Sequence, residues 1–114
     1  MDSISAVLAL KALDGLSRRT EIIAENIANA GTENYRPLGV TFEQALRTAA
    51  GKSEADLRAV EPEIIATTDP LHPPELRLDM ELAKAAETGS RYNAVLEVLN
   101  RRLQIDALAV SKDH

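Results

Sequence analysis

Few side chains in this chain of 114 residues are of a type and spacing that would do chemistry. The two histidines, His72 and His114, stand far apart, and neither has a partner at metal-ligand spacing. A carboxylate pair such as Asp79 and Glu81 can act as acid and base only in a dry pocket that shifts a pKa. The chain has no cysteine, and its five glycines form no phosphate-binding loop. We therefore expect no enzyme, no metal and no cofactor.

Composition and charge exclude further classes. A formal net charge of −5 argues against general binding to nucleic acid or to anionic lipid. The longest apolar run, Ala6 to Leu10, is far shorter than the ~20 residues of a membrane span, so we expect no direct membrane insertion. Asp2 and the lack of a basic start argue against a cleaved secretory signal. With 3% aromatic residues, any core consists of small aliphatic side chains, which suit closely packed helices.

Two long amphipathic helices must position whatever the chain presents. Residues 3–30 and 78–111 carry apolar residues at alternating steps of three and four, the spacing of a coiled-coil seam. A second apolar stripe runs beside the C-terminal seam, which makes that face wider than a helix pair needs. We expect one stripe, with Leu82, Leu96, Leu99 and Leu103, to pair the helices and the other, with Val95, Val98 and Ile105, to face neighbouring chains, although the roles could be exchanged. The expected interface residues are Leu13, Leu16, Ile23, Ile27, Leu82, Tyr92, Leu96, Leu99, Leu103, Val95, Val98 and Ile105.

The middle of the chain has a different character. Residues 41–50 predict a short helix, and residues 51–79 hold four of the five prolines and seven acids against three bases. This composition predicts an extended, flexible, acidic linker over residues 51–77, with a possible short strand at 63–68. The expected fold is all-α: one domain over residues 1–114, in which long N- and C-terminal helices pair as a coiled coil around this Pro-rich middle.

Residues 31–40, after the first helix, are expected to form an elbow. Asn26 and Asn29 share one face of the helix, and their amides can hydrogen-bond the chain that turns back. The simpler alternative is an ordinary helix end, with Gly31 in the left-handed conformation and the amides on free carbonyls. Asn26 favours the elbow because asparagine inside a helix is a poor helix former. In the elbow, Tyr35 packs against the end of the helix.

The sequence AENIANAGTENY (residues 24–35) resembles the N-terminal signature of bacterial flagellar rod and hook proteins, N-[IL]-A-N-x-x-T-x-G-[YF]. The departure is Glu33-Asn34, where that family usually has Pro-Gly, and asparagine is the residue that best replaces glycine at positive φ. The segments VTFEQAL, TTDPLH and SRYNAVLEVLNRRL extend the resemblance, to the short rod proteins, over nearly the whole chain. The residues that match the signature, and so the expected assembly motif, are Asn26, Ile27, Ala28, Asn29, Thr32 and Tyr35.

The resemblance implies a structural subunit of the flagellar basal-body rod that self-assembles around an export channel and transmits torque. It implies four partners: copies of the same chain, other rod proteins, the adaptor between the MS ring and the rod, and the flagellar type III export apparatus. Export by that route, without a cleaved signal peptide, would place the chain in the periplasmic part of the basal body. Two alternatives stay open, another axial protein of the flagellum and a soluble helical adaptor or export chaperone. The last would need the amphipathic ends but not the Asn–Tyr elbow.

Overall fold

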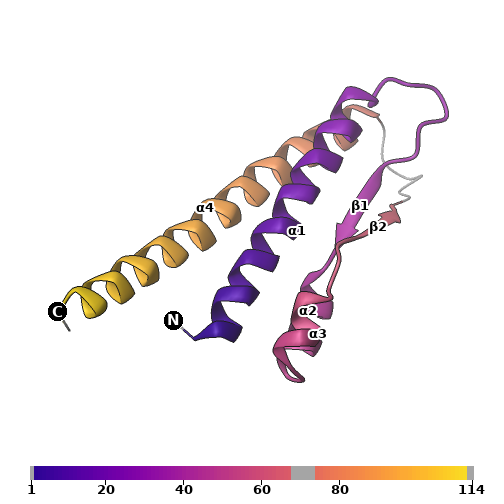
Figure 1. The fold of residues 1–114 in the computed structure, drawn as a ribbon. Coiled ribbons are helices and arrows are strands. Elements are labelled where there is room, and N and C mark those ends of the chain that lie inside the picture. The colour runs from indigo at the N-terminus through magenta and orange to yellow at the C-terminus, as the bar shows by residue number, and fades with distance from the viewer. Residues whose placement is uncertain (1, 68–73, 113–114) are drawn as a thin grey trace.

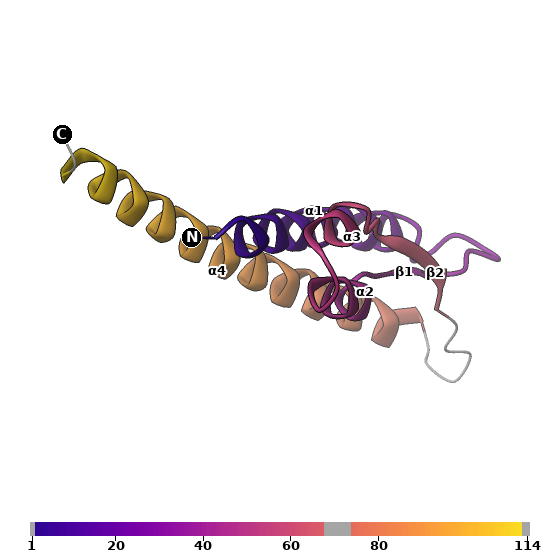
Figure 2. The same cartoon turned by 60° about the horizontal axis from the view of Figure 1, so that its bottom comes forward.

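The computed structural model describes residues 2–67 and 74–112. Two long antiparallel helices lie side by side, and the other elements form an arm along α1 (Figure 1). Figure 2 shows that the C-terminal end of α4 continues past the start of α1. The elements are α1 (Ser3–Ala28), β1 (Leu38–Thr41), α2 (Glu43–Ala50), α3 (Glu54–Arg58), β2 (Glu63–Ala66) and α4 (Pro74–Lys112). The prediction of long N- and C-terminal helices is confirmed.

The all-α prediction is corrected by a small sheet. Strands β1 and β2 pair antiparallel, with Leu38 opposite Ala66 and Thr41 opposite Glu63. We call residues 38–66, which run from β1 through α2 and α3 to β2, the arm. The strand expected at 63–68 exists over residues 63–66.

The linker prediction is wrong for residues 54–58, which form α3. Two local features outweigh the acidic, proline-rich composition. Ser53 caps α3 by accepting a hydrogen bond from the Asp56 backbone N–H at 3.0 Å, and Leu57 is fully buried. Pro74 begins α4, where the missing N–H of proline costs no hydrogen bond. Residues 68–73 of the predicted linker, which include His72, lie outside the described residues.

The main hydrophobic core lies between α1 and the arm. Gly15 makes this packing possible, because a Cβ at this position would lie 2.5 Å from the ring of Phe42. The ring therefore sits directly against the backbone of α1. The buried core residues are Val7, Leu16 and Ile22 of α1 and Val40, Phe42, Leu46, Ala49 and Leu57 of the arm.

Helix α4 contributes much less to this core. It packs chiefly on α1, where Leu99 is buried and Tyr92 and Val95 lie against the edge of the core. Most of its other large apolar side chains stay in water. Those exposed on α4 are Met80, Leu82, Val98, Leu103, Ile105, Leu108 and Val110.

Candidate assembly site

Asn26 is the centre of the elbow. Its side chain is buried, and its amide forms a pair of hydrogen bonds with the backbone of Leu38, the first residue of β1. Nδ2 donates to the Leu38 carbonyl at 2.7 Å, and Oδ1 accepts from the Leu38 N–H at 2.9 Å. The amide thus acts as a strand partner would, and it fixes where the returning chain meets α1.

The same amide joins two further segments. The Tyr35 hydroxyl donates to Asn26 Oδ1 at 2.8 Å, and Asn26 Nδ2 donates to Glu81 Oε2 of α4 at 3.1 Å. Both amide hydrogens and both lone pairs of the oxygen are therefore used. Burial raises the pKa of the Tyr35 hydroxyl, and the charges of Glu25 and Glu81 add to this effect. Asn26 is a buried junction of α1, the elbow and α4.

Asn29 acts on its own helix. It is the C-cap of α1: its Nδ2 donates to the Glu25 carbonyl at 2.9 Å, and its Oδ1 accepts from the Thr32 hydroxyl at 3.2 Å. The helix-end interpretation therefore describes Asn29, and the elbow interpretation describes Asn26. Ala28 is the last residue of α1 and is exposed, whereas Ile27 is half-buried.

The turn of the elbow uses the residues at which the sequence departs from the family signature. The Tyr35 N–H donates to the Thr32 carbonyl at 3.2 Å, which makes Glu33 and Asn34 the central residues of the turn. Asn34 has a φ of 63°, as the substitution of glycine by asparagine predicts. Glycine commonly takes a positive φ at the third position of a turn after proline, so Asn34 can stand in for the glycine of Pro-Gly here. The expectation of a left-handed Gly31 is wrong, because the helix already ends at Asn29 without a residue at positive φ.

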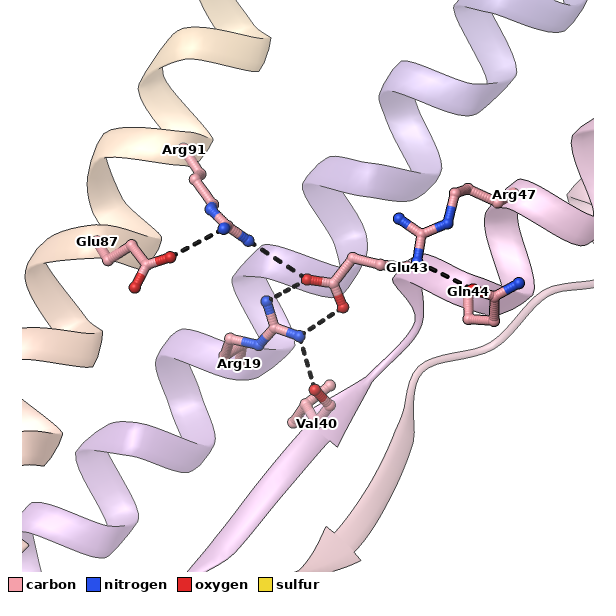
Figure 3. A network of polar contacts seen from close by, with 7 residues as sticks. All are labelled: Arg19, Val40, Glu43, Gln44, Arg47, Glu87 and Arg91. Carbon is pink, nitrogen blue, oxygen red and sulfur yellow. Dashed lines mark hydrogen bonds and ion pairs between the residues drawn. The ribbon is translucent and has the colours of Figure 1, made fainter.

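A second polar junction ties the arm to both helices (Figure 3). Arg19 of α1 binds both carboxylate oxygens of Glu43 at 2.7 and 2.8 Å, and it donates to the Val40 carbonyl at 2.7 Å. Its guanidinium also lies 4.7 Å from the centre of the Phe42 ring. Arg91 of α4 approaches the same carboxylate at 3.5 Å. The Arg19 bond holds the pKa of Glu43 below its ordinary value.

Sequence reasoning missed this junction. Arg19 and Glu43 lie 24 residues apart on different elements. The two residues do not form a helical i, i+4 pair, so no sequence-spacing rule predicts their contact. The only signal was a pair of adjacent arginines, Arg18 and Arg19, in a helix with few other charges.

The structure separates the predicted interface residues into three groups. The expectation that Leu82 and Leu103 hold the helix pair is wrong, since their side chains are 51% and 53% exposed. Val95, expected to face outward, packs against the core. Leu13, Leu16, Ile23 and Leu99 are buried, Ile27, Tyr92, Val95 and Leu96 are half-buried, and Leu82, Val98, Leu103 and Ile105 are exposed.

The position of Leu103 follows from how the helices overlap. Asn26 contacts Glu81, and Ser3 lies 23 residues before Asn26, so in an antiparallel pair the start of α1 lies opposite a point near residue 104. Leu103 therefore lies opposite the first residues of α1, where little of the helix is left to cover it. The residues of α4 from about 105 onward have no part of α1 beside them.

A groove of about 280 Å³ lies between the sheet and α4. Its lining includes the apolar side chains of Ile22, Val40 and Ile65 and the charged side chains of Arg19 and Arg91. Both arginines are engaged with Glu43. Among the described residues, no group of three or more His, Asp or Glu side chains is placed to hold a metal ion. No helix in the same part of the chain is long and apolar enough to cross a membrane.

These features describe an elongated, mostly helical fold in which buried polar groups hold chain segments together and apolar side chains of one helix stay exposed. A family model described as the flagella basal body rod protein matches residues 8–36, which cover most of α1 and the elbow as far as Arg36. In this part the chain is similar to structural proteins of the flagellar basal-body rod. No curated protein matched the chain in a separate comparison.

Proposed function

We propose that this chain is a subunit of the proximal rod of the bacterial flagellum, of the FlgB type. In this role it self-assembles through its terminal helices, paired as a coiled coil, into the drive shaft that transmits torque. The observation that carries the proposal is the family match over residues 8–36, since it spans Asn26 and the elbow that Asn26 holds in place. Resemblance of the later segments to short rod proteins supports the narrower choice of the proximal rod.

The surface of the isolated chain suits a subunit of a polymer. A large aliphatic side chain that stays exposed forgoes about 1.5–3 kcal/mol of possible burial. Exposed Val98 and Ile105 lie on one side of α4, and exposed Ile4 and Leu10 lie on α1. Contacts between unlike surfaces of identical or related chains build open helical assemblies, which is what a rod requires.

The proposed partners are copies of this chain, other rod proteins and the adaptor between the MS ring and the rod. The flagellar type III export apparatus would deliver the chain, without a cleaved signal peptide, to the periplasmic part of the basal body. Rod subunits need rigid interfaces rather than an active site. We accordingly propose no enzymatic activity and no cofactor.

The test is a strain that lacks this chain. We expect loss of motility and basal bodies without a rod in electron micrographs, both restored by the wild-type gene. Unimpaired motility would overturn the proposal. Intact rods together with failed export of one other flagellar protein would instead favour the export-chaperone alternative.

A further inference from the structure

The apolar seam between α1 and α4 does not by itself determine how the helices align. One row of α4 that faces α1, Leu78, Ala85, Tyr92 and Leu99, repeats every seven residues, so a slide of one heptad again places most of its apolar residues against α1. A second row that faces α1 holds Glu81, Thr88 and Val95 and does not repeat. The apolar row alone therefore permits more than one register.

One slipped register would even cover more of the exposed end of α4. A slide of seven residues brings Thr88 opposite Asn26 and places Val110, which is 60% exposed in the observed structure, beside Ile4. Arg102 would then replace Val95 at the edge of the core, where a long side chain can turn its charged end to water, and Asp106 would take the place of Leu99. At the end of α4, the slipped register thus covers apolar surface that the observed register leaves exposed.

A buried polar contact distinguishes the observed register from the slipped one. Glu81 is 7% exposed and is the only buried carboxylate among the residues whose burial the structure describes. It accepts from Asn26 Nδ2 at 3.1 Å and from Lys84 Nζ at 3.3 Å. In the slipped register Glu81 would lie beyond Ala28, the last residue of α1, and would lose Asn26. An amide hydrogen of Asn26 would have to find another acceptor.

We propose that Glu81 is a positioning residue that sets the register of α4 on α1 through its hydrogen bond to Asn26. Buried polar groups at seam positions specify register in helix pairs because a misaligned partner leaves them unsatisfied. Since the same amide anchors β1, the position of α4 is tied to the position of the elbow. This inference concerns the folding of the single chain and does not depend on its role in the rod.

The test measures the distance between two labelled sites. The chain has no cysteine, so Ala24→Cys and Asn100→Cys, both at exposed positions, accept two nitroxide labels without competition. In the observed register the residue opposite Ala24 lies about 17 residues before Asn100, and after the slip about 10 residues before it. At ~1.5 Å per residue the label distance shortens by up to about 10 Å. Pulsed electron paramagnetic resonance resolves such a change.

Glu81→Leu in this labelled background is expected to add a second, shorter distance, while circular dichroism shows that the helices persist. Glu81→Gln, which can still accept from Asn26, is expected to restore the single parent distance. Arg91→Ala is the matched control, because it removes an exposed contact between α4 and the arm and should leave the distance unchanged. If Glu81→Leu fails to fold, Glu81→Met replaces it.

An unchanged single distance in the folded apolar variant would overturn the proposal. Slippage of Glu81→Gln to the same extent as Glu81→Leu would also overturn it, since the hydrogen bond would then not be the cause. Slippage of the Arg91→Ala control would transfer the role to the exposed ion pair and equally refute the assignment to Glu81.

Discussion

Helix α1 has two neighbours, and it holds them in different ways. The arm packs on α1 through a hydrophobic core that includes Leu57 and through Arg19, which donates two hydrogen bonds to Glu43. Helix α4 packs on another side of α1 along a narrow seam, and its far end has no neighbour (Figure 2). The molecule thus has two halves: the arm with the side of α1 that it covers, where apolar side chains are buried within the chain, and α4, where many of them stay exposed. A subunit that assembles with other chains is expected to show this division.

The largest expected effect sharpens this comparison with one substitution made in each half. Leu57→Ala removes a fully buried side chain of the arm and should lower the free energy of unfolding by about 2–5 kcal/mol. Leu103→Ala makes the same chemical change near the end of α4, where the side chain is 53% exposed, and should cost less than about 1 kcal/mol. Urea unfolding followed by circular dichroism measures both. Equal losses would contradict the division into two halves.

The polar contacts of the two halves should differ in the same sense. Arg19→Ala removes two charged hydrogen bonds and a third to the Val40 carbonyl at a half-buried site, and should cost about 1.5–3 kcal/mol. Arg91→Ala removes contacts of a side chain that is 54% exposed and should cost about 0–1 kcal/mol. Denaturant midpoints of the two variants decide the point, and a reversed order would show that α4 is the more firmly held.

The Arg19–Glu43 contact also predicts a dependence on pH. The pKa of Glu43 is lowered in the folded chain, mainly by the hydrogen bond from Arg19. A carboxyl with a depressed folded pKa stabilises the fold above its ordinary pKa of 4.5, and this stabilisation is lost as the pH falls through the folded value. Stability should therefore decline below about pH 4.5, and less steeply in Glu43→Gln. A decline of the same slope in both proteins would assign the effect to other carboxylates.

A smaller effect is expected where the two halves meet. Tyr35→Phe removes the hydroxyl that donates to Asn26 Oδ1 but keeps the ring, so the cost should be about 0.5–1.5 kcal/mol. Tyr92→Phe is the control, because the ring of Tyr92 lies at the edge of the core and the same hydroxyl is removed on α4. Thermal melts of the pair measure the difference. A loss for Tyr92→Phe as large as for Tyr35→Phe would show that the elbow bond has no special weight.

The sequence predicted what local periodicity and local chemistry encode. Both long helices follow from apolar spacing, and the positive φ of Asn34 follows from the residue that replaced glycine. Asn26 could be singled out because asparagine is a poor helix former and is therefore unusual inside a helix. Its partners on Leu38 and Glu81 lie 12 and 55 residues away, and no spacing rule reaches that far.

Within the arm, α2 and β2 follow the predictions of a short helix at 41–50 and a strand at 63–68, but α3 was not predicted, because the composition of this segment hides two decisive positions. Prolines and acids predicted a flexible linker, yet the cap at Ser53 and the burial of Leu57 make residues 54–58 a helix. The roles of Leu103 and Val95 were misassigned for another reason. A heptad pattern states which residues share a face, but it does not state where the partner helix ends.

The substitution with the smallest expected effect on the stability of the single chain should have the largest effect on assembly. Val98 and Ile105 are 58% and 55% exposed, so serine at both positions should change the free energy of unfolding by no more than about 0.5 kcal/mol per site. If these side chains contact neighbouring subunits, the same variant should fail to restore rods and motility in a strain that lacks the chain. Gln104→Ser, an equally exposed polar change on α4, should restore both. Normal rods from the double variant would show that Val98 and Ile105 do not belong to the assembly surface, because the loss of two aliphatic contacts at every interface of a polymer should weaken it measurably.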